Sequence, residues 1–331
     1  MQTLIISETE AGQRLDKYLQ KYLNQAPKSF LYKMMRKKNI VLNAKKAEGS
    51  EKIKAGDEIR LYLSDETIAG FQKTERIAPY RKLDIVYEDG QVLIVNKPAG
   101  MLSQKAKEDD ISLNEYIISY LIHEKKLAKE SLSTFRPGVC NRLDRNTSGL
   151  VLAGKTVAGL QEMSALLKER RVHKYYLCLV HGKIDSSRRV RGYLHKNEKC
   201  NKVEIYEEEK PGSSYIETAY EPLAGNGRIT LLKVLLVTGK THQIRSHLAS
   251  CGHSIVGDTK YGGQRINERF RLKYGVQYQL LHSWRLCFPK LASPFEPLSG
   301  QVTEAPVPDI FSRVLKGEQL GGVNFYENFV E

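Results

Sequence analysis

Strand-forming segments dominate this 331-residue chain from residue 150 onward, and they constrain its fold more than any other feature. Four apolar runs stand out, at residues 150–154, 173–182, 228–239 and 280–289. Runs of this length, most of them rich in β-branched and aromatic residues, predict buried β-strands. The regular alternation of strand and helix that builds a doubly wound parallel sheet is absent. We therefore predict an α+β fold, with a mostly antiparallel mixed β-sheet and short flanking helices.

Shorter signals complete this predicted core. Residues 84–100, DIVYEDGQVLIVNKPAG, read as a hairpin turned at Asp89 and Gly90. Apolar periodicity predicts helices over 113–121, 156–168 and 242–251. The capping signals are Ser112 with Glu115 for the first helix and Thr241 for the third, which should stop at Gly252.

A smaller module precedes the core. Residues 12–23 repeat Leu at every fourth position, which predicts a short amphipathic helix. Ser29 is a suitable N-cap for a second helix over 30–38. Two short strands follow, at 40–43 and 57–63, and we expect all four elements to form one compact unit.

Positive charge is concentrated on the second helix of this module and on the loop after it. The chain has 52 Lys and Arg against 38 Asp and Glu, a net charge of +14. Net charge alone fits a solvated basic surface as well as a polyanionic partner. Residues 27–46, however, contain seven basic and no acidic side chains, and counterion release from a nucleic acid drives binding to such a patch. The candidate RNA-binding residues are Lys28, Lys33, Arg36, Lys37 and Lys38.

Several functional classes are disfavoured by what the sequence lacks. It has no phosphate-binding GxxxxGK[ST] loop, no GxGxxG between a strand and a helix, and no GxSxG elbow. Its five cysteines are scattered without a CxxC pair, which argues against a disulfide framework and a zinc cluster. No apolar run is long enough for a membrane helix, and the first residues do not resemble a signal peptide. We expect a cytoplasmic protein without cofactor or metal.

A polar turn at residues 141–149, NRLDRNTSG, leads directly into the first apolar strand. Asp144 lies between Arg142 and Arg145, and neighbouring positive charge favours the ionised carboxylate. Judged from the local residues alone, this pattern more often reflects a structural ion pair or a turn cap than a functional site.

Two further stretches carry candidate functional side chains. Residues 238–263 are dense in Lys, His, Gln and Arg, and Arg245 is expected in the first turn of a short helix. A buried arginine needs a carboxylate partner, for which we name Asp144; the alternative is an exposed basic loop that binds RNA phosphate. Tyr176, on the strand at 173–182, fits either core packing or an aromatic platform for a base, with a phenol able to move a proton.

Taken together, these stretches resemble the RluA-type family of pseudouridine synthases. The similarity rests on NRLDRNTSGLVL, HKYYLCLVHG and TGKTHQIRSHLASCGHSIVGDTKYGG, with NKPAGMLS and LLHSWRLCFP in addition. The N-terminal module resembles the αL RNA-binding module of ribosomal protein S-four, on GQRLDKYL, IVLN and AGDEIRLYL. The combined layout is similar to that of enzymes acting on large-subunit ribosomal RNA.

This resemblance implies a role for each candidate residue. Asp144 would attack the target nucleoside, and Arg245 would pair with it and keep it ionised and aimed. Tyr176 would stack on the uracil and take a proton, and Arg142 would hold the helix open where the base leaves. The implied reaction, isomerisation of uridine to pseudouridine, requires no cofactor and no metal. The family most often has His where this chain has Asn141, so the role of that His is in question here.

The resemblance also implies a domain organisation and a partner. Residues 1–64 would form the S-four-like module, 65–80 a linker, 81–300 the catalytic domain and 301–331 a C-terminal tail. The implied partner is ribosomal RNA, with transfer RNA as the alternative, and nothing calls for a membrane or for more than a monomer. Two rival functions stay open: a binding protein with an inert catalytic domain, at which Asn141 hints, and a ribosomal RNA methyltransferase, which needs a glycine loop that we do not find.

Overall fold

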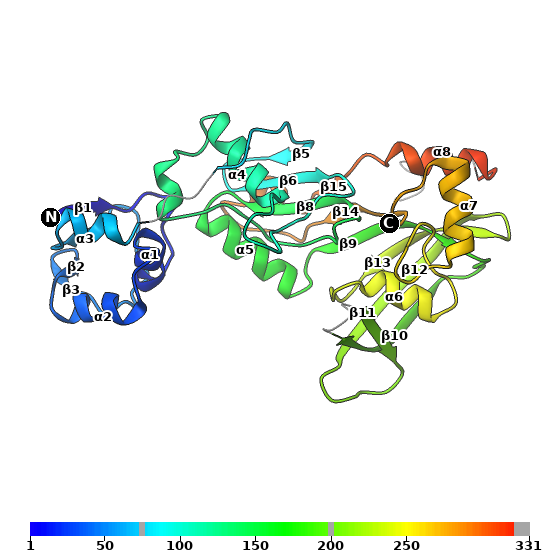
Figure 1. Ribbon diagram of the computed structural model, residues 1–331, viewed down its shortest axis with the longest axis horizontal. Helices are drawn as coiled ribbons and strands as arrows, with labels where there is room; N and C mark the ends of the chain where they lie inside the picture. The colour runs from blue at the N-terminus through cyan, green and yellow to red at the C-terminus, as the bar shows by residue number, and fades with distance from the viewer. Residues whose placement is uncertain (73–76, 198–201, 321–331) are drawn as a thin grey trace. The chain divides into compact units, whose positions relative to one another are not determined.

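The computed structural model describes residues 1–72, 77–197 and 202–320, and it contains one small and one large β-sheet (Figure 1). Contacts divide the chain into two compact units. The first comprises the described residues of Met1–Ile94, Gln104–Asn141 and Leu152–Ala165. The second comprises those of Val95–Ser103, Arg142–Val151 and Leu166–Glu331.

The small sheet and its helices form the N-terminal module, which lies within the first unit. Its elements are β1 (Gln2–Ile5), α1 (Leu15–Tyr22), α2 (Lys28–Arg36), β2 (Ile40–Leu42), β3 (Lys45–Lys46), β4 (Glu58–Leu61) and α3 (Asp65–Gly70). The sheet order is β1-β4-β2-β3. The predicted leucine repeat, Leu15, Leu19 and Leu23, is fully buried in a core made only of residues from this module. The module therefore has a hydrophobic core of its own.

One prediction for this module was wrong in detail, and one strand was missed. Helix α2 begins at Lys28 with Pro27 as its N-cap residue, so Ser29 lies inside the helix and does not cap it. The proline ring holds Pro27 at a φ of −59° while its ψ of 144° is extended, and this conformation turns the chain into the helix. Strand β1 was not predicted, because a short, half-exposed strand depends on its pairing with the distant β4.

The stretch predicted as a linker, residues 65–80, begins with a helix. In α3 the Ser64 side chain accepts a hydrogen bond from the backbone N–H of Thr67 and caps the first turn. Ile68 of this helix is buried in the core of the N-terminal module. Residues 73–76 of the predicted linker lie outside the described residues.

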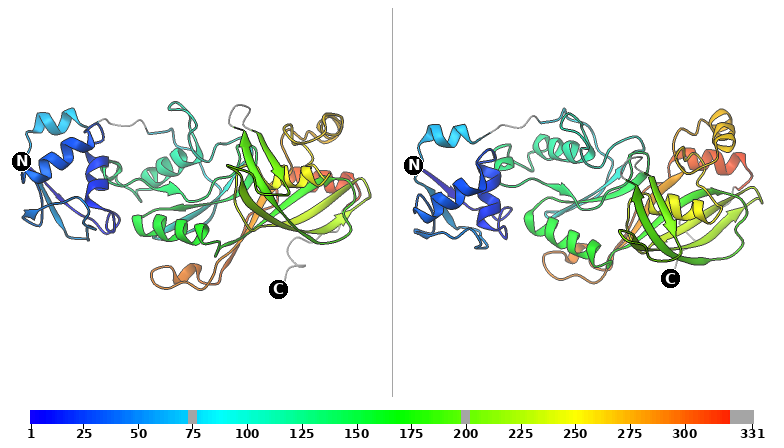
Figure 2. Two further views of the ribbon diagram at one scale, coloured as in Figure 1. Left: turned by 90° about the horizontal axis from the view of Figure 1, so that it is seen from below. Right: turned by 60° about the horizontal axis from the view of Figure 1, so that its bottom comes forward.

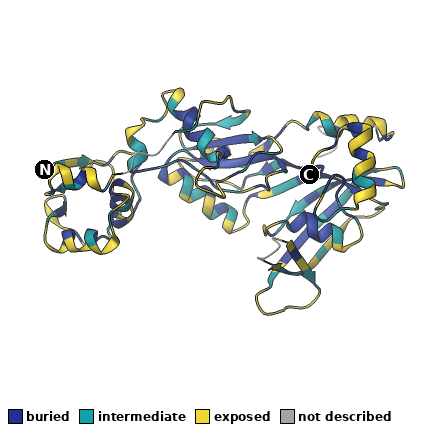
Figure 3. Cartoon of the chain, in the orientation of Figure 1, coloured by how far each residue is buried: buried dark blue, intermediate teal, exposed yellow. Residues whose placement is uncertain are grey.

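The large sheet confirms the predicted α+β class. Its strands are β5 (Ile85–Glu88), β6 (Val92–Lys97), β7 (Gly138–Val139), β8 (Ser148–Gly154), β9 (His173–His181), β10 (Arg188–Asn197), β11 (Lys202–Tyr206), β12 (Ser214–Gly225), β13 (Ile229–Leu236), β14 (Leu281–Cys287) and β15 (Val302–Glu304). Their order is β11-β10-β12-β13-β9-β14-β8-β6-β5, with β15 on β14 and β7 on β8. Strands β9 to β13 pair antiparallel, whereas β14 and β8 pair in parallel, so the sheet is mixed. Every residue of β8 is buried, as Figure 3 shows.

The remaining helices are short and flank this sheet. They are α4 (Leu113–His123), α5 (Val157–Lys168), α6 (Gln243–Ser250), α7 (Gln264–Tyr274) and α8 (Asp309–Gly317), with 3-10 turns at Glu130–Ser133 and Glu296–Leu298. The capping box of Ser112 and Glu115 is confirmed. The predicted cap Thr241 was wrong, because His242 is the N-cap residue of α6.

The described part of the predicted tail is packed rather than extended. Strand β15 pairs with β14, and α8 contacts α7, as Figure 2 also shows. Phe311, Val314 and Leu315 of α8 are buried in one core with Trp284 of β14. Residues 302–317 therefore belong to the same folded unit as the large sheet's strands β9 to β14.

One row across three adjacent strands positions the candidate site. Gly149 of β8 pairs with Ser283 of β14, and Ser283 pairs with Tyr176 of β9. Gly149 has a φ of 111°, and a Cβ atom there would collide with the carbonyl of Ser283. Only glycine adopts such a φ readily and also has no Cβ atom to collide. Gly149 therefore lets the backbone of the polar turn come close to β14, as the Thr-Ser-Gly sequence predicts.

No helix in the described part of the chain combines the length and the apolar character needed to cross a membrane.

Candidate active site

The turn that carries Asp144 is held by the segment after β6. The Lys97 side chain is fully buried, and its ammonium group donates to the backbone carbonyls of Pro98, Met101 and Arg145 at 2.8–3.1 Å. The Ser103 hydroxyl donates to the carbonyl of Leu143 at 2.9 Å and accepts from its N–H at 3.0 Å. These bonds fix the backbone on both sides of Asp144.

Lys97 was not among the predicted site residues, although it belongs to the matching segment NKPAGMLS. Burial lowers the pKa of Lys97 to about 7, whereas the negative charge of Asp144 acts to raise it. Three carbonyl acceptors match the three N–H groups of an ammonium ion. Lys97 therefore ties the backbone of Pro98, Met101 and Arg145 together at the Asp144 turn.

The predicted contact between Arg245 and Asp144 is present. Arg245 lies in the first turn of α6, and its Nη1 donates to Asp144 Oδ2 at 2.8 Å. The Arg245 side chain is 8% exposed and that of Asp144 25% exposed. Arg245 is therefore not part of an exposed basic loop, and the carboxylate of Asp144 stays accessible.

A second carboxylate, Asp258, was missed by sequence reasoning. It is fully buried and forms a bidentate ion pair with Arg245. Arg245 Nε donates to Oδ2 at 2.7 Å, and Nη2 donates to Oδ1 at 2.9 Å. Burial alone would raise the pKa of Asp258, but the hydrogen bonds and charge of Arg245 hold it below its usual range. A second partner for Arg245 could have been anticipated, because a buried arginine that faces an accessible carboxylate needs another partner on its inner side.

His242 and Tyr261 complete the polar surroundings of Asp144, and sequence reasoning missed both roles. His242 Nε2 lies 3.9 Å from Asp144 Oδ2, and its Nδ1 lies 3.0 Å from the Tyr261 hydroxyl. Burial lowers the pKa of His242, against the opposing effect of Asp144, so its imidazole is neutral at neutral pH. Its backbone is left-handed, with a φ of 55°, a conformation that costs a residue with a side chain about 1–2 kcal/mol.

Tyr176 is buried on β9, beside Ser283 in the row described above. Burial raises the pKa of Tyr176 to about 12, a hydrogen bond with Ser283 lowers it, and the charge of Asp144 raises it further. The phenol is therefore protonated at neutral pH. Tyr176 packs as a core residue does, and it also lies within the electrostatic reach of Asp144.

The two residues before Leu143 differ in their surroundings. Asn141 Oδ1 accepts a hydrogen bond from the backbone N–H of Leu152 at 2.7 Å, so its amide supports β8. Arg142 is exposed and lies two positions from Asp144. The predicted RNA-binding side chains of the N-terminal module, Lys28, Lys33, Arg36, Lys37 and Lys38, are all exposed.

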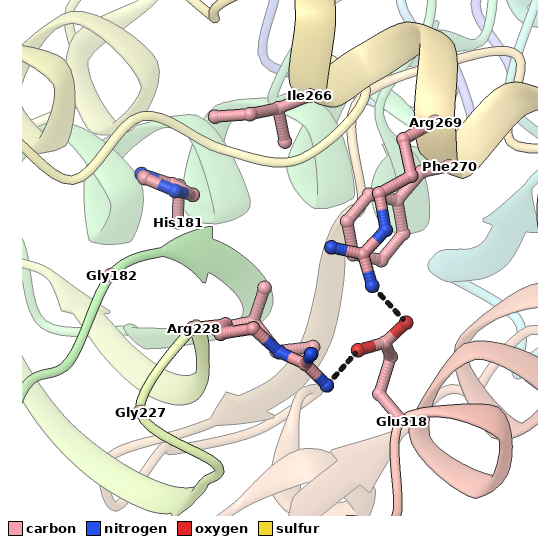
Figure 4. Close-up of a pocket in the computed structure, with 9 residues that line it drawn as sticks. His181, Gly182, Gly227, Arg228, Ile266, Arg269, Phe270 and Glu318 are labelled. Carbon is pink, nitrogen blue, oxygen red and sulfur yellow. Dashed lines mark hydrogen bonds and ion pairs between the residues drawn. The ribbon is translucent and has the colours of Figure 1, made fainter.

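A cavity of about 250 Å³ with charged walls lies elsewhere, at the end of β9 that His181 forms. Figure 4 shows Glu318 between Arg228 and Arg269, to which it is bonded at 3.4 and 3.3 Å. Burial alone would raise the pKa of Glu318, but hydrogen bonds from Tyr274 and Lys273 hold it low. None of the predicted site residues lines this cavity, so we do not assign it to the Asp144 site.

The Asp144 cluster is suited to nucleophilic or acid–base chemistry. One carboxylate oxygen is held by a buried arginine, a phenol lies nearby, and the turn is fixed by backbone hydrogen bonds. In the three described ranges, no group of three His, Cys, Asp or Glu side chains is arranged to hold a metal ion.

Comparison with known proteins identifies the family. Residues 91–250 match the family described as RNA pseudouridylate synthase. The ribosomal large subunit pseudouridine synthase C of Vibrio vulnificus is 32% identical over 309 residues, 89% of this chain and 91% of that protein. Its namesake from Salmonella typhimurium is 30% identical over 94% of each chain. The structure of human RNA pseudouridylate synthase domain containing 4 shares the fold, with a TM-score of 0.56 at 19% identity over 71% of this chain and 92% of that one. The chain therefore belongs to the RNA pseudouridylate synthase family, and it is an isomerase.

Proposed function

We propose that this enzyme isomerises uridines of large-subunit ribosomal RNA to pseudouridine, and that Asp144 is the residue that attacks the nucleoside. The observation that carries the proposal is the pair of hydrogen-bonded contacts from Arg245 to Asp144 and Asp258. Tyr176 lies within the electrostatic reach of Asp144. The relatives named for the large ribosomal subunit align with about nine tenths of the chain, which favours ribosomal over transfer RNA.

The reaction needs few chemical groups. The bond between C1′ of the ribose and N1 of the uracil breaks, and a bond between C1′ and C5 forms. The proton on C5 leaves and a proton is taken up at N1, so that the product is an isomer of the substrate. One carboxylate serves this reaction by attacking the sugar, by attacking the base, or by removing a sugar proton.

Arg245 is proposed to position Asp144. Its guanidinium binds Asp258 with two hydrogen bonds and offers Nη1 to Asp144, so its orientation is set from the inner side of the site. A buried arginine aimed in advance stabilises negative charge without reorganising during the reaction. This arrangement keeps the attacking carboxylate in one place while the base moves.

Tyr176 is proposed to stack on the uracil and to relay the proton that leaves C5: its hydroxyl oxygen accepts that proton while its own O–H proton passes to solvent. Replacing Tyr176 with Phe is expected to lower the single-turnover rate by about 10²–10⁴, the usual contribution of a proton-transfer group. RNA affinity should change less than threefold, because the ring that stacks is retained. Release of tritium from uridine labelled at C5 measures the rate. A Phe variant with the wild-type rate would rule out proton transfer by this phenol.

Arg142 is proposed to contact the RNA where the target base leaves its stack. The residue is exposed and lies two positions before Asp144. Removing a base from its stack costs on the order of a few kcal/mol, and a guanidinium that occupies the vacated place offsets part of that cost.

We propose that residues 1–71, which include α3, form an RNA-binding domain, and that a catalytic domain begins near residue 81. The module has its own hydrophobic core, and all its candidate basic residues are exposed. Packing of α8 with β14 favours a catalytic domain that extends beyond residue 300. Because one chain supplies the whole proposed site, we propose that the enzyme acts as a monomer. We also propose a cytoplasmic location.

Replacing Lys33, Arg36 and Lys37 with Gln is expected to weaken RNA binding and to reduce its salt dependence. Each phosphate contact contributes about 0.7–0.9 to the slope of log K against log salt, so the slope should fall by about 2–3. Filter binding at salt concentrations from roughly 50 to 300 mM measures the slope and tests this prediction. The matched control replaces the exposed Lys107, Lys129 and Lys316, which removes the same charge. Equal slopes in both variants would argue against a specific role for the module.

Pseudouridine mapping tests the proposed substrate. Ribosomal and transfer RNA are mapped from cells with and without the gene, complemented by wild type or Asp144→Ala. Sites in large-subunit RNA that are lost with the gene and restored only by wild type support the proposal. Lost sites in transfer RNA alone would overturn the substrate, and an unchanged map in cells without a paralogue would overturn the activity.

A further inference from the structure

A chain of polar contacts leads from the backbone to Asp144 through Tyr261 and His242. The N–H of Val203 donates to the Tyr261 hydroxyl oxygen at 3.1 Å. That hydroxyl lies 3.0 Å from His242 Nδ1, and His242 Nε2 lies 3.9 Å from Asp144 Oδ2. All four residues belong to the same compact unit, so the chain of contacts lies within one body.

These contacts select one tautomer of His242. Because Val203 supplies a proton to the tyrosine oxygen, the tyrosine's own O–H is available to donate to Nδ1. The proton of the neutral imidazole is then on Nε2, facing the carboxylate. The other tautomer would direct the lone pair of Nε2 at a carboxylate, which is repulsive.

Arg245 and His242 both approach the same oxygen of the Asp144 carboxylate. Arg245 Nη1 lies 2.8 Å from Oδ2, and His242 Nε2 lies on that side as well. Within the described residues, no hydrogen bond or ion pair ends on Oδ1. The 3.9 Å separation exceeds a hydrogen bond, and such contacts commonly shorten when substrate binds.

We propose that His242 is a positioning residue for Asp144: Tyr261 holds its imidazole as the Nε2–H tautomer, this N–H and Arg245 together hold Oδ2, and Oδ1 is thereby presented to the nucleoside. The inference rests on the proposed role of Asp144. It also accounts for the left-handed backbone of His242, a strained conformation at the start of α6 that brings the ring between Tyr261 and Asp144.

Burial is the main cause that lowers the pKa of His242, and the charged groups that face it act in both directions. Asp144 and Asp258 supply negative charge, and Arg245 and Lys260 supply positive charge. The ring of Tyr261 packs edge-on against that of His242, with centroids 5.7 Å apart. Charges of both signs thus face the ring, and the hydrogen bond with Tyr261 sets its tautomer.

Nitrogen NMR of the full-length enzyme labelled with ¹⁵N-histidine tests the tautomer without substrate. The His242 signals are assigned as those that disappear in His242→Gln. We expect a protonated Nε2 and an unprotonated Nδ1 in wild type, and a mixture of tautomers in Tyr261→Phe. A wild-type enzyme with its proton on Nδ1 would overturn the proposal.

Two replacements of His242 separate positioning from backbone effects. Glutamine is long enough to place an amide N–H where Nε2 lies, whereas asparagine is too short but tolerates the left-handed backbone better. If His242 acts through its Nε2–H, the Gln variant should retain at least about tenfold more of the single-turnover rate than the Asn variant. RNA affinity should be equal in the two.

A merely structural role predicts the opposite order, with Asn at least as active as Gln, and that order would overturn the proposal. Failure of the underlying function is a distinct result. In that case Asp144→Ala would retain the wild-type rate, whatever the two His242 variants show.

Discussion

Replacing Asp144 with Asn is expected to abolish pseudouridine formation while leaving RNA binding intact. Loss of a group that acts directly on the substrate costs a factor of about 10⁴ or more in rate. Asparagine retains an oxygen that accepts from Arg245, and Asp258 still neutralises that arginine, so the fold should not change. The lost property is the negative charge that attacks the nucleoside.

Tritium release from C5-labelled RNA under single-turnover conditions measures this effect, and filter binding measures the affinity. Asp144→Ala should be equally inactive, which excludes a residual role for the amide. Asp109→Asn makes the same change at an exposed carboxylate and should behave as wild type. Substantial activity in either Asp144 variant would refute the proposed role.

Replacing Asp258 with Ala is expected to have the largest effect on stability. Arg245 would keep its charge in a buried position, and among the described residues the partly exposed Asp144 would be its remaining ion-pair partner. Breaking a buried ion pair from one side typically costs about 3–5 kcal/mol of unfolding free energy. Activity should fall as well, because nothing on the inner side would orient the guanidinium. Denaturant unfolding, followed by fluorescence of the single tryptophan, Trp284, measures the loss.

The double variant Asp258→Ala with Arg245→Met separates the two effects. It removes the unpaired charge, and methionine fills part of the space, so most of the lost stability should return. Activity should not return, because Asp144 would lack its positioning partner. If Asp258→Ala loses less than about 1 kcal/mol of unfolding free energy, as an exposed ion pair would, the contact contributes little to stability.

Local patterns predicted the central strands of the large sheet and several helices, but not β10, β11, β12, α7 or α8. The apolar runs became β8, β9, β13 and β14, and the capping box became the start of α4. These predictions succeeded because burial of a strand and capping of a helix depend on residues close together in the chain. The contact of Asp144 with Arg245, 101 positions apart, was instead inferred from the need of a buried arginine for a carboxylate.

Elements that depend on distant partners were missed or misplaced. Strand β1 exists through its pairing with β4. The cap of α6 is His242 rather than Thr241, in a left-handed conformation that is uncommon for residues other than glycine. Contacts of its imidazole with Tyr261 and Asp144 accompany this conformation, and neither contact is visible in the local sequence.

The sequence by itself determined the fold class, the family resemblance and the identity of Asp144, Tyr176 and Arg245 as candidates, because periodicity and motif order are properties of the chain. Only the tertiary structure decided that Arg245 is shared between Asp144 and Asp258, that Lys97 holds the Asp144 turn, and that His242 faces Oδ2. These facts depend on burial and on contacts between residues far apart in sequence. A buried charge requires a partner, but the fold determines which partner it finds.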